Sequence, residues 1–287
     1  MTTTLPASSS SPPSPDIPIP YRTKGTTMPH DLLALPYRTV KPRQQGLTMV
    51  MDTGLPTAYF EDAISSAATH VDVVKFGWGT SLVTADLGRK IACLRDLGIR
   101  FYFGGTLFEK FVVQDSFDGF LQWCRQWGAD TVEISNGTIA LTNTEKAAYI
   151  RTCAGSFRVL SEVGYKDPVR SQLLSADQWV DSIKEDIDAG AELVVTETRE
   201  SGRSGLCTAD GELRVDLLEH ILSGAVDVDR LLFEAPTKEL QAEFVRRVGT
   251  NVNLGNVAAS DLIGLETLRL GLRADTLPFF EAQMVHA

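Results

Sequence analysis

The sequence predicts an α/β fold, a (β/α)8 TIM barrel, from three observations. Eight short apolar segments have the character of strands, and helical patterns lie between them from Gly46 onward. The strand starts are separated by about 20 to 40 residues, the length of one βα unit. Each apolar segment also ends in a charged or small polar residue. In a barrel of parallel strands these ends surround one mouth, where active sites are found.

The strand segments follow one another with their chemistry at the carboxyl end. In order they are LTMVMD, VDVVK, RFYFGGT, TVEIS, RVLSE, ELVVTETR, RLLFE and NVNLGN, with the polar positions Asp52, Lys75, Thr106, Glu133 and Ser135, Glu162, Glu197 and Arg199, Glu234, and Asn256. Any single carboxylate of this kind has an ordinary alternative as a helix cap or a salt-bridge partner. A ring of them interleaved with cations is instead typical of a site for a metal and an anion.

The helical patterns alternate with these strands. They cover residues 57–68, 85–97, 116–127, 144–154, 176–189, 215–222, 237–248 and 259–271. Several end at a glycine of the kind that stops a helix before a strand, namely Gly98, Gly128, Gly190 and Gly249. Eight such units favour a closed barrel over an open doubly wound sheet. Dinucleotide binding has no support, because no GxGxxG motif follows the first strand.

Composition and charge exclude several classes of function. The chain has 287 residues, 43% hydrophobic and 22% charged, as in ordinary globular proteins. A formal net charge of −10 argues against binding to nucleic acid or to an acidic membrane surface. No apolar stretch reaches the roughly 18 residues that a membrane span needs. The four cysteines form no CxxC pair, which favours reduced thiols in a cytoplasmic enzyme. The four histidines lie outside the strand ends, which argues against a zinc or histidine-base mechanism.

Residues 1–40 differ from the rest and are predicted to form an N-terminal extension. Nine of the thirteen prolines lie between Pro6 and Pro42, among Ser and Thr residues. We expect this segment to be disordered or loosely docked, and residues 41–287 to form the catalytic barrel. It has no hydrophobic region of a secretory signal. A transit peptide is the alternative, because the segment lacks acidic residues before Asp16.

The alternation of side chains along a strand predicts which residues face the barrel mouth. In TVEIS, Val132 and Ile134 suit the helix layer, so Glu133 is expected inside. The same count groups Glu197 with Arg199, Lys75 with Val71 and Val73, Glu162 with Leu160, and Asp52 with Thr48 and Val50. A bulge or a register error would invert any one of these assignments.

The strand-end side chains predict a site for a hard cation and for anionic groups. Buried charges are costly, so a ring of carboxylates implies mutual pairing, a metal or a ligand. Oxygen ligands without His or Cys favour Mg2+. Arginine and lysine suit phosphate, sulfonate and carboxylate groups. The loops at residues 77–81 and 104–109 offer backbone N–H groups, and Gly255 and Asn256 end the eighth strand, where barrel phosphate sites are frequent.

Long motifs in this order resemble the phosphosulfolactate synthase family over residues 41–277. They are KPRQQGLTMVMD, VKFGWGTS, GGTLFE, VEISNG, VLSEVGYKDP, RESG, LLFEAP, NVNLGN and LETLRLGLRADT. The resemblance implies a (β/α)8 barrel that adds sulfite to phosphoenolpyruvate in a Mg2+-dependent reaction. The product would be (2R)-phospho-3-sulfolactate, in the first step of one route to coenzyme M. The resemblance also suggests a homo-oligomer.

The resemblance and the strand ends together give each candidate residue a role. Lys166, in the segment SEVGYKDP, is expected to be the general acid that protonates C2, with a pKa lowered toward neutrality by burial and neighbouring cations. Glu133, Glu162 and Glu197 are the metal candidates, with Asp52 and Glu234 in reserve. The candidates for the phosphate, carboxylate and sulfite groups are Arg43, Lys75, Arg199 and Asn256. Which cation meets which anion is left open.

Three positions depart from the family pattern, and two other functions stay open. Tyr165 stands where a second lysine is common, Thr198 where alanine is usual, and Asn136 where an acid is common. These differences put the nucleophile in doubt more than the fold. One alternative is a divergent barrel enzyme that adds another nucleophile to an enol phosphate. The other is a non-catalytic homologue of the heat-stress type, although such a protein is expected to have lost its charged mouth.

Overall fold

The computed structural model describes residues 32–224 and 226–285, and the chain divides into two units, residues 1–35 and residues 36–287. Most of the predicted extension, residues 1–31, lies outside the described residues. The barrel unit begins earlier than the expected residue 41. Arg38 pairs with Glu266 at 2.8 Å, and the backbone N–H of Thr39 donates to Asn251. Residues 36–40 are therefore part of the barrel unit.

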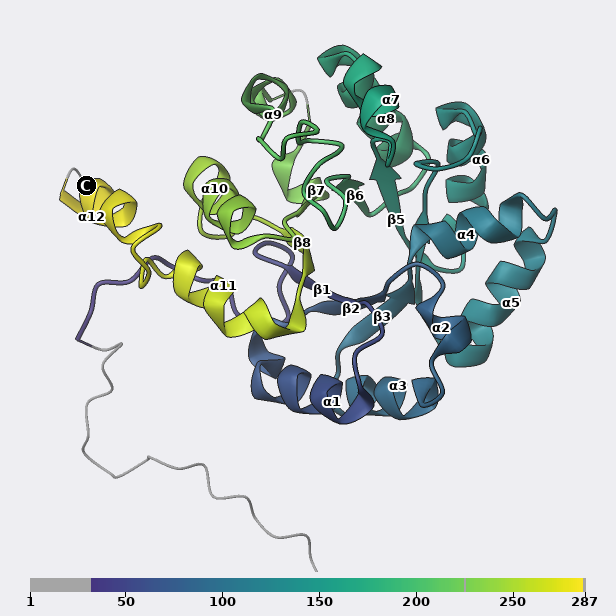
Figure 1. Cartoon of the computed structure of the whole chain (residues 1–287), viewed down its shortest axis with the longest axis horizontal. Helices are drawn as coiled ribbons and strands as arrows, with labels where there is room; N and C mark the ends of the chain where they lie inside the picture. The colour runs from purple at the N-terminus through teal and green to yellow at the C-terminus, as the bar shows by residue number, and fades with distance from the viewer. Residues whose placement is uncertain (1–31, 225, 286–287) are drawn as a thin grey trace, which may run out of the picture. The chain divides into compact units, whose positions relative to one another are not determined.

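Eight parallel strands form a nearly closed barrel surrounded by helices, which confirms the predicted fold class (Figure 1). Hydrogen-bonded ladders join them in the order β3-β2-β1-β8-β7-β6-β5-β4, and β3 packs against β4 where the barrel closes. The strands are β1 (Thr48–Asp52), β2 (Val73–Phe76), β3 (Arg100–Phe103), β4 (Thr131–Ile134), β5 (Arg158–Val163), β6 (Leu193–Thr196), β7 (Leu231–Glu234) and β8 (Leu254–Val257). All eight predicted strands are present.

The helices include all eight that the sequence patterns predict. These are α1 (Thr57–Ser66), α3 (Leu87–Asp96), α5 (Phe117–Trp127), α6 (Asn143–Ala154), α8 (Ala176–Asp188), α9 (Val215–Leu222), α10 (Lys238–Val248) and α11 (Leu262–Arg269). Four further helices were not expected: α2 (Thr80–Val83), α4 (Gly105–Val112), α7 (Pro168–Leu173) and α12 (Leu277–Val285). Gly128 follows α5 with a φ of 67°, the left-handed conformation predicted for a helix stop.

Two apolar layers fill the barrel unit. The larger lies between the sheet and the helices and includes Val50, Val132 and Phe233. The smaller lies inside the barrel and consists of Met49, Tyr102, Leu160, Val195 and Leu232. This inner cluster fills one part of the barrel interior. The inward polar side chains of the strands lie beyond it, at the carboxyl ends.

Val71, which the same count groups with Lys75, precedes β2 and belongs to the outer layer. The inward and outward faces otherwise follow the predicted alternation except in β1. Val50 belongs to the outer layer and Met49 to the inner cluster, so Asp52 faces the helices. Its carboxylate pairs with Lys90 of α3 at 2.6 Å, and both side chains are fully buried. Each face of β1 carries apolar residues, Val50 on one and Met49 on the other, so polarity could not decide between them. Asp52 is thus removed from the reserve metal ligands.

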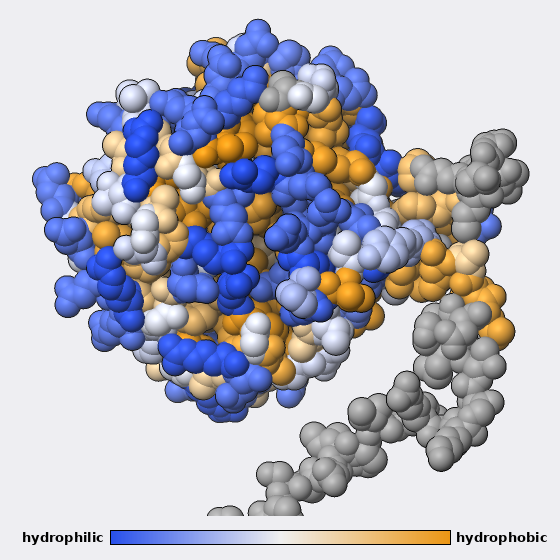
Figure 2. Space-filling view, turned by 180° about the vertical axis from the view of Figure 1, so that it is seen from behind, coloured by the Kyte–Doolittle hydropathy of each residue, from blue (hydrophilic) through white to orange (hydrophobic). Residues whose placement is uncertain are grey.

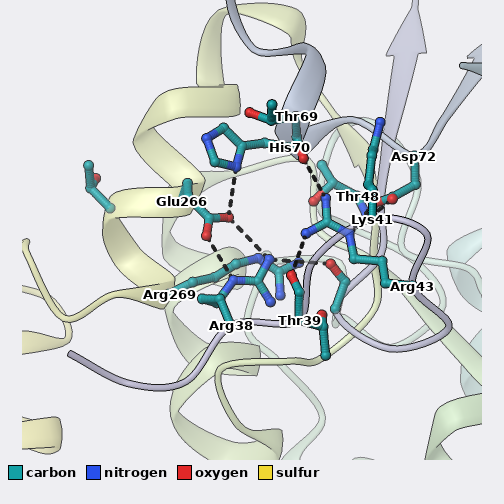
Figure 3. Close-up of polar contacts among 12 residues, drawn as sticks. Arg38, Thr39, Lys41, Arg43, Thr48, Thr69, His70, Asp72, Glu266 and Arg269 are labelled. Atoms are coloured by element: carbon teal, nitrogen blue, oxygen red, sulfur yellow. Dashed lines mark hydrogen bonds and ion pairs between the residues drawn. The ribbon is translucent and has the colours of Figure 1, made fainter. Parts of the chain in front are cut away.

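The amino ends of the strands are closed by ion pairs and by one buried arginine (Figure 3). Arg269 of α11 is fully buried and donates to the carbonyl oxygens of Thr250 at 2.8 Å, Val252 at 2.7 Å and Leu47 at 3.2 Å. Burial, with the nearby charge of Arg38, lowers the pKa of Arg269 to about 9. Since these carbonyls belong to segments that enter β1 and β8, Arg269 ties the floor of the barrel together.

The surface of the barrel unit is mixed in polarity. Figure 2 shows hydrophilic side chains over much of one face, with apolar patches between them. Val83 of α2 and Leu173 of α7 are among the exposed apolar residues. Within residues 32–224 and 226–285, no helix combines the length and the apolar character needed to cross a bilayer.

We expect Arg269→Met to lower the free energy of unfolding by about 3 kcal/mol, because three main-chain carbonyls each lose a charged donor. Urea unfolding followed by circular dichroism measures this change. The control is Arg247→Met, since Arg247 pairs with Glu243 in a partly exposed position and its loss should cost no more than about 1 kcal/mol. Equal, small effects of the two substitutions would show that Arg269 does not secure the floor.

Candidate functional site

A buried lysine lies at the centre of the carboxyl ends of the strands. The ammonium of Lys75, at the end of β2, is 3.0 Å from Glu133, 3.5 Å from Glu234 and 3.6 Å from Glu162. These carboxylates come from β4, β7 and β5. Strands distant in the sequence therefore share one cation, as expected for the mouth of a barrel.

A second lysine extends this cluster toward solvent. Lys166 lies in the loop between β5 and α7, and its ammonium contacts both Glu162 and, at 2.8 Å, Glu197. Its side chain is 22% exposed, whereas those of the two glutamates are almost fully buried. Glu162 contacts both lysines, so it links the two halves of the site.

Backbone N–H groups also donate to two of the carboxylates, to the oxygen of Glu133 that contacts Lys75 and to the second oxygen of Glu234. Gly105, the first residue of α4, donates to Glu133 at 2.5 Å, and Thr198 donates to Glu234 at 3.0 Å. A helix N-terminus favours a negative charge, so α4 stabilises Glu133. A Cβ on Gly105 would lie 2.5 Å from the hydroxyl of Ser135, which explains the small residue at this point.

The charges of the cluster are strongly coupled. Burial opposes a charged Lys75, but Glu133, Glu234 and Glu162 outweigh it and raise the pKa of Lys75 well above its ordinary value. Burial also opposes charge on Glu162, and Lys166 and Lys75 nevertheless lower its pKa to about 2. Glu197 behaves in the opposite way: burial raises its pKa well above the usual range, and the attraction of Lys166 does not compensate. Glu197 is therefore the carboxyl of this cluster that holds a proton most readily.

The cluster has more acidic than basic groups, and this excess fits a divalent cation. Glu133, Glu162, Glu197 and Glu234 face Lys75 and Lys166 alone among the ion pairs described. One oxygen of Glu133 is buried and lacks a hydrogen-bond partner in the described part of the chain. That part contains no group of three His, Cys, Asp or Glu residues arranged to hold a metal ion, and four of its carboxylates contact the two lysines instead. The donor set itself, all oxygen, is the type that suits Mg2+.

Two other predicted residues lie at the same end of the barrel. Asn256, in β8, is buried with a left-handed φ of 52°, and its side-chain oxygen has no partner within the described residues. Such strain is typical of functional positions. Arg199 follows β6, also with a left-handed φ of 57°, and donates to the carbonyl of Lys166 at 3.3 Å. Its side chain is 44% exposed, so it belongs to the rim and not to the buried cluster.

Arg43 lies at the opposite end of the barrel. Its guanidinium pairs with Asp72 at 2.9 Å, and Asp72 also accepts the N–H of Thr48 at the start of β1 (Figure 3). A residue that precedes a strand reaches the amino rim, which is why the structure does not bring Arg43 to the cluster. We therefore leave Arg43 out of the site.

Sequence reasoning missed several buried residues that support the site. Glu109 of α4 accepts the Ser135 hydroxyl at 2.6 Å and the Thr138 N–H at 3.2 Å, and so holds the loop after β4. Tyr102 of β3 belongs to the inner cluster, and burial followed by the charge of Glu133 raises its pKa well above the usual value. Glu109 lies in the motif GGTLFE, but the motif was interpreted as a loop. A helix pattern starting at Gly105 could have identified it.

We expect Lys75→Met to destabilise the fold by roughly 3 to 5 kcal/mol, because three buried carboxylates lose their shared cation. Adding Glu133→Gln should restore part of this loss by removing one of the unpaired charges. Urea unfolding of the single and double variants measures both effects. If the second substitution lowered stability further, Lys75 and Glu133 would not be coupled as the distances indicate.

Comparisons with known proteins agree with the family resemblance. A family model described as (2R)-phospho-3-sulfolactate synthase (ComA) matches residues 36–275. Phosphosulfolactate synthase of Bacillus subtilis is 50% identical over 244 residues, which cover 85% of this chain and 97% of that protein. Phosphosulfolactate synthase of Methanocaldococcus jannaschii is 43% identical over 237 residues, which cover 81% and 94%.

Solved structures support the fold alone. A crystal structure of 3-hexulose-6-phosphate synthase matches with a TM-score of 0.50 at 16% identity, over 78% of this chain and 97% of that one. The family model, in contrast, spans nearly the whole barrel unit, and the curated relatives are similar along almost their full length. The chain therefore belongs to the (2R)-phospho-3-sulfolactate synthase family, and it is an enzyme of that family.

Proposed function

We propose that this enzyme adds sulfite to phosphoenolpyruvate, giving (2R)-phospho-3-sulfolactate, with the help of Mg2+. Membership of the family supports the product. The observation that carries the reaction is the position of Lys166, a partly exposed ammonium held between Glu162 and Glu197 at the mouth of the barrel. It is a proton donor that a small anionic substrate can reach.

The proposed reaction forms two new bonds to phosphoenolpyruvate, a C–S bond at C3 and a C–H bond at C2. The sulfur lone pair of sulfite forms a C–S bond with the methylene carbon, C3, of phosphoenolpyruvate. The electrons of the double bond move to C2 and its carboxylate, and C2 then takes a proton while the phosphate ester stays intact. The enzyme must therefore stabilise negative charge beside the carboxylate and deliver the proton to one face of C2.

Lys166 is the residue to which we assign the proton. The sequence predicted a lowered pKa, but the structure indicates the reverse: burial opposes the charge, while Glu162 and Glu197 raise the pKa of Lys166 well above its ordinary value. Lys166 therefore starts each cycle as an ammonium, the form that a donor needs. Any step that draws Glu162 and Glu197 away from it makes it a stronger acid.

The carboxylates would hold the metal, and the remaining polar groups would meet the anions. Glu133, Glu162 and Glu197 supply oxygen ligands for Mg2+, with Glu234 beside them. When bound, Mg2+ supplies positive charge next to the substrate carboxylate. Lys75, Arg199 and Asn256 are the candidates for the phosphate, carboxylate and sulfite groups. The intact charged cluster argues against a non-catalytic homologue.

Mass spectrometry of the reaction products tests this function. The purified protein is incubated with phosphoenolpyruvate, sulfite and Mg2+, and the product is identified as phosphosulfolactate. Reactions that lack sulfite distinguish a barrel enzyme that adds water or another nucleophile to the enol phosphate. Phosphoenolpyruvate left unchanged in the complete mixture would refute the proposal.

We expect Lys166→Met to lower kcat by about 100-fold or more while KM for phosphoenolpyruvate changes little, since the proton donor is lost. In D2O, residual turnover should lose its stereochemical preference at C2. Steady-state kinetics and chiral chromatography of the product measure both effects. Lys110→Met, at an exposed position of α4, is the control and should keep full activity. Wild-type turnover in Lys166→Met would remove Lys166 from this role.

Binding of Mg2+ should release protons and should weaken as the pH falls. Because burial raises the pKa of Glu197 above its ordinary value, this carboxyl binds a proton at a higher pH than an ordinary glutamate does, and metal binding would compete with that proton. Protonation is favoured below that pKa, so the affinity is lower at acidic pH and rises with pH. Calorimetry in buffers of different ionisation enthalpy measures the protons released. Glu197→Gln should abolish most of this release, and equal release in that variant would contradict the assignment.

A further inference from the structure

A buried ion pair between the helices and the sheet contacts the main chain of a residue of the site. Lys146 of α6 and Asp186 of α8 lie 2.7 Å apart in the layer between helices and sheet, with no exposed surface on either side chain. Lys146 also donates to the main-chain carbonyl of Glu162 at 2.8 Å. Glu162 is the carboxylate that contacts both Lys75 and Lys166.

The helices that carry this pair bury apolar residues beside it. Ile150 lies one helical turn from Lys146 in α6, and Ile183 lies about one turn from Asp186 in α8, and both belong to the buried apolar layer. The amide of Asn143 also donates to Asp186 at 3.5 Å. A buried ion pair pays a large desolvation cost, and apolar residues of similar volume are often at least as stable. Fold stability alone is therefore a weak reason for Lys146 and Asp186 to be charged.

The second buried pair of the helix layer has a different target. Lys90 of α3 contacts the carboxylate of Asp52, which also accepts the N–H groups of Gly54 and Leu55. That pair holds the loop after β1. The Lys146 pair instead reaches the backbone of a residue whose side chain lies in the carboxylate cluster.

We propose that Lys146, held in place by Asp186, is a positioning residue that fixes Glu162 and, through it, Lys166. Lys146 fixes the position of the main-chain carbonyl of Glu162 in β5. The side chain of Glu162 then holds the ammonium of Lys166. This inference rests on the proposed role of Lys166 as proton donor. Small displacements of a reacting group cost large factors in rate, so the pair acts on turnover and not on substrate affinity.

A compensated double variant separates positioning from stability. Lys146→Met and Asp186→Leu, each alone, leave a buried charge without its partner and should destabilise the fold. The double variant K146M/D186L removes both charges and should unfold at or near the wild-type urea midpoint. We expect its kcat to stay about 10- to 100-fold below wild type, with KM for phosphoenolpyruvate nearly unchanged. Wild-type kcat in the double variant would overturn the proposal.

A second measurement keeps the test decisive whatever the substrate proves to be. Hydrogen exchange followed by mass spectrometry reports on the peptide that carries Glu162 and Lys166 without any reaction. We expect faster exchange there in K146M/D186L than in the wild type, and exchange at the wild-type rate would overturn the proposal. Arg38→Met, which breaks a nearly buried pair at the amino end of the barrel, is the control and should keep both kcat and this exchange rate. An inactive wild-type protein would refute the proposed reaction, and the exchange result would still decide the positioning role.

Discussion

The sharing of Lys75 by three buried carboxylates is the interaction on which the site depends. Glu133, Glu162 and Glu234 come from three strands, and their charges would repel one another in a low-dielectric interior without a cation between them. The fold meets this cost with donors that cannot move away, including the N–H groups of Gly105 and Thr198. A displacement of one strand end therefore changes the ion pairs of the others. This coupling favours a single geometry of the mouth.

The two ends of the barrel use charge in different ways. At the amino end, Arg38 with Glu266 and Arg43 with Asp72 form separate pairs, and Arg269 bonds to main-chain carbonyls. Each of these cations serves a local structural contact. At the carboxyl end, Glu162 contacts two lysines and Lys75 contacts three carboxylates. Shared charges can be redistributed when a ligand arrives, whereas separate pairs would have to be broken, so chemistry is suited to the carboxyl end.

The fold and most of the cluster could be predicted from the sequence because the strands have one apolar face and one polar end. That contrast placed Glu133, Glu162 and Glu197 correctly. It failed for Asp52, because each face of β1 carries apolar residues and Lys90 is a partner from a different segment, helix α3. It also failed for Arg43, since closeness to a strand in the sequence does not say which end of the barrel a residue reaches. Lys146 and Asp186 gave no signal, because their partnership exists only once α6 and α8 pack on β5.

The same balance of charge is the reason why we propose a further cation for anionic substrates. Its two lysines are already occupied by carboxylates, so an entering anion would meet an excess of negative charge. The raised pKa of Glu197 is one response to that excess, caused by burial and incompletely offset by Lys166. The metal that we propose would offset the same excess, and Glu162 and Glu197, which contact Lys166, are among its candidate ligands. In the proposed reaction, metal, substrate and proton donor would therefore be linked through Glu162 and Glu197, the two carboxylates that Lys166 contacts.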